Sequence, residues 1–382
     1  METVTSQPLD ASGAASFCIT EFKCTNFRSY AVADITPGPR LNCLIGANGS
    51  GKTNVLDALY YLALCRSPQN LRDTRNIRHG ESAFAIFGKF SSSAASPFSV
   101  SLGYTDGKVK EIQIDSEPLP KISDHIGRIP LIAAFPSDTY IIDDGGDLKR
   151  RFLNAAISQY DHQHLNDLLK YDRLVRQRNA HLKDSNHDSG LLDVLDAQIA
   201  ECATPIFKAR VDFCNAIRPL FQAFYAQLVD SQESVDLEYK SQLQKGDLVN
   251  LLRGARENDR QLQHTTVGPH RDNLDFSLGD FPIRAEGSQG QRRSYMIALR
   301  LAQLQLLAQK TKATPILLLD DLFDRLDPAR VARLISIVLN EPFGQVFITD
   351  TQTDRIAEAL DYDTDSHQFF GVEDGNITPI NV

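Results

Sequence analysis

Cysteine is scarce in this sequence, and long apolar runs are absent from it. The six cysteines form no C-x-x-C pair, and only Cys18 and Cys24 lie close together. This spacing favours reduced thiols over a disulfide framework or a zinc site. No run approaches the roughly 18 apolar residues of a membrane-spanning helix, and the start of the chain lacks the charged and apolar regions of a signal peptide. We therefore expect a cytoplasmic protein without a membrane partner.

An excess of positive charge is also missing. The 40 lysines and arginines are outnumbered by 49 acidic residues, which gives a net charge of −9. This balance argues against a protein whose whole surface grips nucleic acid, but it is compatible with a local basic groove. A chain of 382 residues with 42% hydrophobic and 23% charged residues is ordinary globular material, long enough for two domains or for one domain with a large insertion.

The hydrophobic period changes twice along the chain. From residue 17 to about 103, alternating and short apolar runs predict strands around one helix near residues 53–65. From residue 147 to about 228, apolar residues recur every three or four positions and predict helices, with breaks at Pro205 and Pro219. Strands are expected again near 235–240, 273–285, 315–321 and 345–350, with helices at 289–309 and from 328. The pattern predicts an α/β body with a mostly helical insertion.

A complete phosphate-binding motif, GANGSGKT, lies between a short apolar run and a helical segment. Its residues are Gly46, Ala47, Asn48, Gly49, Ser50, Gly51, Lys52 and Thr53. The glycines let backbone N–H groups approach phosphate oxygens, and the following helix begins with its positive end at the loop. In this motif the lysine reaches the β- and γ-phosphates and the threonine hydroxyl ligates Mg²⁺. The sequence therefore predicts an ATP and Mg²⁺ site.

Two adjacent aspartates, Asp320 and Asp321, end the apolar run ILLL. Like charges at the exit of a buried strand repel each other and resist desolvation, so a cation is expected beside them. A strand that ends in this way fits the second half of a nucleotide site. We expect Asp320 to hold Mg²⁺, directly or through water, and Asp321 to orient or deprotonate the attacking water.

Two further segments resemble those of ABC-type ATPases. EGSQGQRRS contains the S-x-G-Q core of their signature motif, formed here by Ser288, Gln289, Gly290 and Gln291. LFDRLD resembles their D-loop, with Leu326 and Asp327 at the matching positions. The resemblance implies that the signature of one subunit completes the phosphate site of another, so that ATP drives formation of a homodimer. A helix N-terminus at the signature is suited to holding a γ-phosphate.

Several colinear segments, among them TNFRSY, YYLALCRSPQN, RNIRHGES and TTVGPHRDNLDF, resemble the bacterial RecF family over residues 17 to 353. The resemblance implies an SMC-like ATPase head without a long coiled coil and with weak, switch-like hydrolysis. It also implies ATP-dependent binding of DNA at single-strand gaps and double-strand/single-strand junctions. The expected partners are RecO and RecR, and the expected outcome is loading of RecA in DNA repair, replication restart and SOS induction.

The domain boundaries follow from the same resemblance. We expect a disordered leader at 1–16, an ATPase lobe I at 17–120 and 310–382, and a mostly helical lobe II at 121–309 that carries the signature.

Some positions depart from the general ABC pattern. Asp321 stands where transporters usually have glutamate, and Asp350 with Thr351 stands where many have a switch histidine. No Q-loop glutamine is evident, although Ser137 or Asp138 could occupy its place. The missing glutamine and histidine speak against a transporter module. An SMC-like module of another DNA-processing or ATP-gated nuclease system is the alternative, and it would need a further acidic catalytic domain.

Basic residues on the helical lobe are the candidates for DNA contact. They are Lys149, Arg150, Arg151, Arg176 and Lys183, with Arg173 and Arg178 beside them. Arg176 and Lys183 are seven residues apart and share one helical face. We expect contacts to the DNA backbone that are independent of base sequence and that weaken steeply with salt. His270 and Arg271 are expected to be structural, while Arg292 and Arg293 could face phosphate or a partner subunit.

Overall fold

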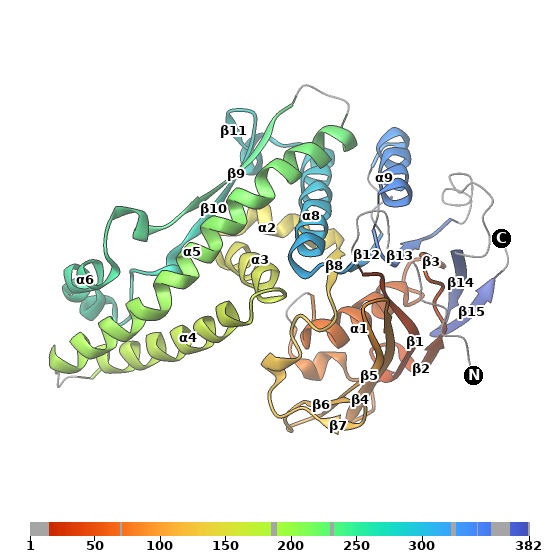
Figure 1. Cartoon of the computed structure of the whole chain (residues 1–382), viewed down its shortest axis with the longest axis horizontal. Helices are drawn as coiled ribbons and strands as arrows, with labels where there is room; N and C mark the ends of the chain where they lie inside the picture. Colours follow the sequence, from red (N-terminus) through yellow and green to blue (C-terminus); the bar gives the residue numbers. More distant parts are fainter. Residues whose placement is uncertain are drawn as a thin grey trace. The chain divides into compact units, whose positions relative to one another are not determined.

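The computed structural model of this protein describes most of the chain. The described residues are 15–68, 71–184, 189–229, 233–321, 326–341, 343–352 and 367–380. The chain divides into two compact units, which Figure 1 shows in the colours of the sequence. Unit 1 comprises Met1–Asp138, Gln227–Asp230 and Arg293–Val382, and unit 2 comprises Thr139–Ala226 and Ser231–Arg292.

Unit 1 contains a six-stranded sheet in the order β15-β14-β3-β13-β12-β8. Its strands are β3 (Leu41–Ile45), β8 (Leu131–Ala134), β12 (Ile316–Leu319), β13 (Val346–Asp350), β14 (His367–Glu373) and β15 (Asn376–Ile380). All neighbours pair in parallel except β14 and β15, which form an antiparallel hairpin. The apolar strands β8 and β12 and the strand β3, whose one polar residue is Asn42, are buried throughout, as expected for strands covered on both faces. Because these strands are parallel, their carboxyl ends meet at one edge.

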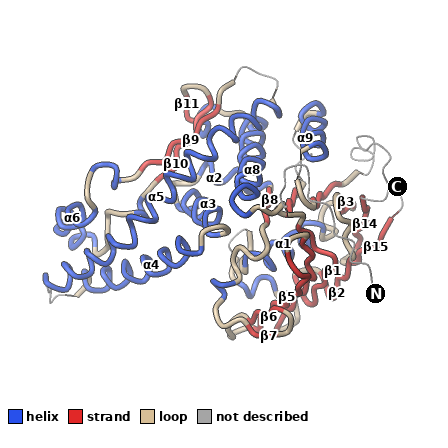
Figure 2. The backbone as a smooth tube through the Cα atoms, viewed as in Figure 1, coloured by secondary structure: helices blue, strands red, loops and turns tan. Residues whose placement is uncertain are grey.

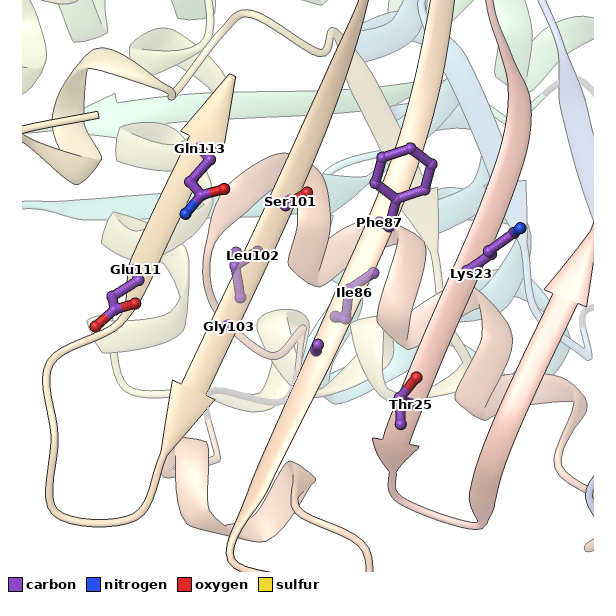
Figure 3. A pocket seen from close by; sticks show the side chains of 10 residues that line it. Lys23, Thr25, Ile86, Phe87, Ser101, Leu102, Gly103, Glu111 and Gln113 are labelled. Carbon is purple, nitrogen blue, oxygen red and sulfur yellow. The ribbon is translucent and has the colours of Figure 1, made fainter. Parts of the chain in front are cut away.

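A second sheet of unit 1 is antiparallel, in the order β2-β1-β4-β5-β6-β7. Its strands are β1 (Phe17–Phe27), β2 (Tyr30–Ile35), β4 (Ala83–Ser92), β5 (Ala95–Thr105), β6 (Glu111–Ile114) and β7 (Glu117–Pro118). Alternate side chains of this sheet enter one hydrophobic core with helix α1 (Lys52–Leu64). The other side chains, such as Lys23, Phe87, Ser101 and Gln113, line a shallow pocket on the outer face (Figure 3).

Unit 2 is mostly helical, as Figure 2 shows in blue. Its helices are α2 (Tyr140–Asp143), α3 (Asp147–Ser158), α4 (His162–Leu182), α5 (Ser189–Leu228, whose last two residues belong to unit 1), α6 (Leu248–Leu262) and α7 (Ile283–Glu286). A three-stranded antiparallel sheet, in the order β11-β10-β9, consists of β9 (Val235–Lys240), β10 (Asn273–Leu278) and β11 (Phe281–Pro282). Apolar residues of α4, α5 and α6 form its core. These elements agree with the helical period predicted from residue 147 onward.

Helix α5 corrects one prediction. Pro205 and Pro219 were expected to interrupt the helical region, but α5 passes through both as one helix of 40 residues. A proline inside a helix removes one hydrogen bond and costs about 3 kcal/mol. Burial of apolar side chains along the same helix, including Ile199, Ile206 and Phe221, supplies the opposing stabilisation.

The two units differ at their boundaries from the lobes predicted at 17–120 with 310–382 and at 121–309. Strand β8 and helix α8 (Gln289–Thr311) from Arg293 onward belong to unit 1, although the prediction placed both in lobe II. Pairing of β8 with β12 links segments that are far apart in the sequence, so local periodicity gave no sign of it. Ala15, placed in the leader by the prediction, is buried and bridges Ala313, while residues 1–14 lie outside the described residues.

The remaining elements are short or belong to the end of unit 1. Helix α9 (Pro328–Asn340) precedes β13, and the 3-10 helices of the described residues are η1 (Asp73–Asn76), η2 (Ile122–Asp124), η3 (Pro136–Thr139), η4 (Gln242–Lys245) and η5 (Pro269–Arg271). The predicted α/β class with a mostly helical second part is confirmed. Across the described residues, none of the helices has the length and apolar character needed to cross a membrane.

Candidate nucleotide site

The glycine-rich loop connects the carboxyl end of β3 to the start of α1. Gly51 has φ = 114°, a left-handed conformation that favours glycine, and a Cβ atom there would lie 2.9 Å from the Tyr30 hydroxyl oxygen. The Tyr30 hydroxyl in turn donates a hydrogen bond to the Gly51 carbonyl at 3.1 Å. At Gly46 a Cβ would come within 2.2 Å of the Val372 carbonyl oxygen. Both glycines are therefore required by the path of the backbone.

Lys52 and Ser50 provide the polar interior of this loop. The Lys52 ammonium donates to the carbonyls of Gly46 and Ala47 at 2.6 and 2.8 Å, and the side chain is almost wholly buried. The Ser50 hydroxyl is a buried polar atom with no hydrogen-bond partner in the described part of the chain. A buried lysine and an unmatched hydroxyl next to a helix N-terminus fit an anionic ligand such as a phosphate chain.

Asp320 meets two hydroxyl groups at the carboxyl edge of the parallel sheet. The Thr53 hydroxyl lies 2.9 and 3.1 Å from its two carboxylate oxygens, and the Thr349 hydroxyl donates to it at 2.9 Å. Thr53 is in α1 and Thr349 in β13, so three elements converge on one carboxylate that is only 3% exposed. Thr53 and Asp320, 267 positions apart in the sequence, are thus brought together by the fold.

The electrostatics of Asp320 indicate a cation site. Burial raises the pKa of this carboxyl, and Asp321 raises it further, while the two hydroxyls and Lys52 oppose the shift. Within the described ranges, no guanidinium or ammonium group lies at ion-pair distance from Asp320. A buried carboxylate beside a threonine hydroxyl, with no contacting cation from the described residues, is an oxygen donor set that fits Mg²⁺.

Asp321 follows with an unusual backbone. Its φ is 45°, its N–H donates to the Thr349 hydroxyl at 2.8 Å, and its carbonyl accepts from the Arg293 guanidinium. Arg293, which the sequence suggested could face phosphate or a partner, is buried and holds this turn in place. The contacts fix the direction of the chain directly after the strand. Residues 322–325, the first part of the predicted D-loop, lie outside the described residues.

The described part of the D-loop caps a helix. Asp327 is the N-cap residue of α9, and its carboxylate accepts the Arg330 N–H at 3.0 Å. A carboxylate at this position stabilises a helix start through its hydrogen bond and through the helix dipole. Leu326 precedes it and is partly exposed.

Sequence reasoning missed two groups near this site. Thr349 bridges Asp320 and the Asp321 N–H, yet its motif, ITD, gave no sign beyond its place at the end of a strand. Asp57 lies one turn after Thr53 in α1, is buried, and forms an ion pair with Arg28. Burial raises the pKa of Asp57 to about 7, Arg28 opposes this shift, and Asp320 adds to it.

Two positions considered for the missing sensors have structural partners. Asp138 accepts two hydrogen bonds from the Arg300 guanidinium, at 2.7 and 2.9 Å, and a third from the Phe135 N–H. Asp350 ends β13, is buried, and accepts the Thr351 N–H. Asp138 is therefore engaged within unit 1, which weakens its interpretation as a Q-loop substitute.

The signature residues form a reciprocal cap at the start of α8. The Ser288 hydroxyl accepts the Gln291 N–H at 3.2 Å, and the Gln291 side chain accepts the Ser288 N–H at 2.8 Å. Gln291 also donates to Glu233 at 2.8 Å. This pairing is a capping box, and it leaves Ser288 and Gln289 exposed at a helix N-terminus.

The candidate DNA contacts on unit 2 are not equivalent. Lys149 is buried with its ammonium 5.2 Å from the centre of the Phe276 ring, and burial lowers its pKa. Arg150 donates to the Asp272 carbonyl, and Arg151 forms an ion pair with Asp147 at 2.6 Å. Because Lys149 is buried, its prediction as a surface contact is wrong. The helical spacing of the sequence did not show which face of the helix packs inward.

The other basic residues of unit 2 are likewise partly exposed and partly buried. Arg176 and Lys183 are exposed on α4 and at its C-cap. Arg178 is fully buried between Asp196 and Asp259, so it too is excluded as a surface contact. His270 and Arg271 are structural, as expected: the His270 ring bonds Tyr171 and the Thr265 carbonyl, and Arg271 also donates to that carbonyl.

Fold and site together define an ABC-type ATPase head of the SMC-like kind. A family model described as "AAA domain, putative AbiEii toxin, Type IV TA system" matches residues 41–349. The solved Smc head domain from Pyrococcus furiosus has a TM-score of 0.56 and 16% identity, and the match covers 96% of each chain. At that identity the likeness concerns the fold.

Closer similarity defines the family. The chain is 40% identical to the DNA replication and repair protein RecF of Phocaeicola vulgatus over 92% of this chain and 96% of that protein. The RecF of Porphyromonas gingivalis is 38% identical over 94% of this chain and 99% of that protein. A solved structure of the recombination mediator protein RecF with ATP, in the RecFOR pathway, has a TM-score of 0.86 and 26% identity, and the match covers 96% of this chain and 100% of that one. The chain belongs to the RecF family of DNA replication and repair proteins.

Proposed function

We propose that this protein is an ATP-dependent, DNA-binding recombination mediator. The observation that carries the proposal is the convergence of the Thr53, Asp320 and Thr349 side chains below the glycine-rich loop. The arrangement offers backbone N–H groups and Lys52 to the phosphates and an oxygen donor set to Mg²⁺. The ATP in the solved RecF structure supports the choice of nucleotide.

Each residue of the site has a proposed role. Residues 46–53 surround the phosphates, Lys52 contacts the β- and γ-phosphates, and Thr53 with Asp320 holds Mg²⁺. When bound, Mg²⁺ neutralises charge on the phosphate oxygens. The Asp321 carboxylate orients the attacking water. An aspartate reaches less far than a glutamate, which is compatible with weak hydrolysis that works as a switch.

Assembly is the second part of the proposal. Ser288, Gln289, Gly290 and Gln291 are exposed or partly exposed at the start of α8, and the N-terminus of this helix suits a γ-phosphate presented by a second copy. Leu326 and Asp327 would lie at the same interface and report the nucleotide state. ATP thus promotes a homodimer, and the dimer binds DNA through its phosphate backbone.

The biological role follows from family membership. The relatives are named as DNA replication and repair proteins, and the solved relative belongs to the RecFOR pathway. We infer that this bacterial protein acts in the cytoplasm with RecO and RecR. It would bind at single-strand gaps and duplex junctions and help to load RecA in repair, replication restart and SOS induction.

Sedimentation velocity tests the switch. The full chain should sediment as a monomer without nucleotide and as a dimer with ATP and Mg²⁺. Asp321→Asn should keep the dimer because it retains binding while slowing hydrolysis, and Lys52→Ala should remain a monomer. Persistent monomer in the Asp321→Asn protein with ATP and Mg²⁺ would exclude the ATP-dependent dimer.

A further inference from the structure

An arginine-rich segment follows α1 in unit 1. We define the arginine segment as residues 66–68 and 71–79, which contain Arg66, Arg72, Arg75, Arg78 and His79. Apart from Asp73 it has no acidic residue, although the whole chain carries a net charge of −9. We propose that the arginine segment is a contact surface for the DNA phosphate backbone, an inference that rests on the proposed DNA binding.

The charges of this segment are not balanced by the protein. Among the described residues, Arg66, Arg72 and Arg75 form no ion pair, and Arg78 has only a long one, 3.9 Å, with Glu81. Some exposed basic residues elsewhere are paired, for example Lys89 with Glu21 at 2.5 Å and Lys240 with Asp275 at 2.8 Å. Unpaired guanidinium groups that cluster in an otherwise acidic protein give a local positive potential.

The one acidic residue of the segment is already engaged. The Asp73 carboxylate accepts hydrogen bonds from the Lys110 ammonium, at 3.1 and 3.2 Å, and from the Tyr61 hydroxyl at 2.6 Å. The same ammonium donates to the Cys65 carbonyl at 2.6 Å. Lys110 thus neutralises the charge of Asp73. Because it also bonds Cys65, the residue before Arg66, it links the end of α1 to η1.

The local backbone places the arginines together. Arg72 is the N-cap of η1, with an extended backbone, and Arg75 lies three residues later within the helix. Both are exposed, whereas Asn76 between Arg75 and Arg78 is buried. Two exposed guanidinium groups three residues apart can each bond a phosphate in two-pronged geometry.

Arg28 links the segment to the first turns of α1, which follow the nucleotide loop. This side chain donates to Asn76 at 3.2 Å and to Ser67 and Asn54 at 3.4 Å, and it forms the ion pair with Asp57. Backbone hydrogen bonds add to the anchor, because Arg28 donates to the Asn76 carbonyl and Arg78 donates to the Asn26 carbonyl. Asn54 and Asp57 belong to the first turns of α1, so the basic surface and the phosphate loop share one support.

A fixed backbone that carries guanidinium groups fits a phosphodiester chain better than an acidic peptide. Phosphates repeat at regular spacing along a duplex and need no complementary apolar pocket, and the described segment offers Leu71 as its only large exposed apolar side chain. Two of the predicted contacts of unit 2, Lys149 and Arg151, are weaker candidates. Arg151 is paired with Asp147, and Lys149 is buried.

Salt-dependent DNA binding tests this surface. The double variant Arg72→Gln/Arg75→Gln of the full chain is titrated with duplex DNA in ATP and Mg²⁺ at several salt concentrations. Each lost phosphate contact lowers the slope of log K against log salt by about 1, so we expect a loss of about 2. Lys89→Gln/Lys240→Gln removes the same charge at two exposed positions that are already paired with Glu21 and Asp275, and it should change the slope by less than about 1. Arg72→Lys/Arg75→Lys keeps the charge and should retain most of the slope.

The outcomes separate this inference from the proposed function. If the unaltered chain binds DNA and Arg72→Gln/Arg75→Gln keeps its slope and affinity, the surface is wrong while DNA binding stands. If the unaltered chain binds no DNA with ATP present, the proposed function itself fails. ATP affinity, measured on the same samples, should not change in the variant. Loss of binding to polyglutamate but not to DNA would assign the segment to an acidic protein and overturn the proposal.

Discussion

Two buried charged groups, Arg178 in unit 2 and Asp320 in unit 1, have partners of different kinds. In unit 2, Arg178 is fully buried and donates to Asp196 and Asp259, each at 2.7 Å, so that cation and anions match within the unit. In unit 1, Asp320 is almost as deeply buried, but its carboxylate accepts hydrogen bonds from the Thr53 and Thr349 hydroxyls. A buried network in which guanidinium and carboxylate charges match has a structural role. A buried carboxylate without a protein cation beside it is expected where a ligand supplies the cation.

A second network in unit 2 follows the same rule. Arg210 donates to Asp272 at 3.0 Å, to the Pro269 carbonyl at 2.7 Å and to Asn154 at 2.9 Å. Tyr239 donates to the same aspartate. Burial of charge alone therefore does not identify a functional site in this protein. The nature of the partner, guanidinium or hydroxyl, separates the two cases.

The largest effect should come from breaking the Arg178 network. Arg178→Met leaves Asp196 and Asp259 with one fewer cation inside the unit, and loss of one partner of a buried pair costs about 3–5 kcal/mol. We expect the free energy of unfolding to fall by that amount in guanidinium denaturation followed by circular dichroism. Arg176→Met, on the exposed face of the same helix, should change it by less than about 0.5 kcal/mol. Equal effects of the two variants would refute the distinction.

An effect of intermediate size should appear with pH. Burial lowers the pKa of His164 and of His270 to about 4, with Arg210 and Arg271 as further causes, while both titrate near 6.5 in the unfolded chain. Their contribution to stability is complete above about pH 6.5 and is lost as the pH falls towards 4. For Asp57, whose pKa burial raises to about 7, stability is instead lost as the pH rises from about 4 through 7. Lowering the pH should therefore reduce the stability of unit 2 around His164 and His270. It should not reduce the stability that Asp57 contributes in unit 1.

Hydrogen exchange measured by mass spectrometry can separate the two units. Between about pH 7 and about pH 5, the free energy of opening in α3 and α4 should fall by about 1–2 kcal/mol more in the unaltered chain than in His164→Leu. The strands of unit 1 serve as the internal reference. A drop of the same size in both proteins would show that His164 does not carry the acid sensitivity.

The smallest effect on stability should come from Asp320→Asn. This change keeps the shape and removes a buried charge that Asp321 repels, so the free energy of unfolding should stay within about 1 kcal/mol or rise. Calorimetric titration measures how much more tightly the protein binds ATP with Mg²⁺ than without it. We expect this ratio to be at least about tenfold smaller in Asp320→Asn than in the unaltered chain. Asp34→Asn, which removes an exposed carboxylate paired with Lys23, is the matched control. A large loss of stability in Asp320→Asn would contradict the cation-binding role and would show that Asp320 is a structural residue, like Asp196 and Asp259 in unit 2.

Much of the nucleotide site could be predicted from the sequence because its signals are local. The loop at 46–53 needs glycines at fixed positions, and Gly51 at φ = 114° shows why. Asp320 could be recognised because two adjacent acids end an apolar run. Thr349 could not be recognised in the sequence, because it reaches Asp320 only through the pairing of β13 with β12 in the sheet.

Helix periodicity predicted the elements of unit 2 but not their contacts. The spacing of Lys149, Arg150 and Arg151 is compatible with an exposed basic face, yet Lys149 packs on Phe276. Likewise, two prolines predicted breaks in a helix that long-range packing keeps continuous. Local propensities of a few kcal/mol are overridden when burial of many apolar side chains opposes them.

By itself, the sequence determined the class of the protein, its phosphate loop, its paired aspartates and its family. These depend on short motifs whose chemistry is contained in neighbouring residues. Only the tertiary structure decided which charges are balanced, because a partner such as Asp259 for Arg178 lies 81 positions away. It also showed that Lys149 and Arg178 are buried while Arg72 and Arg75 are exposed and unpaired among the described residues. Sequence specifies which groups can ionise, and packing determines which of them must find a partner outside the chain.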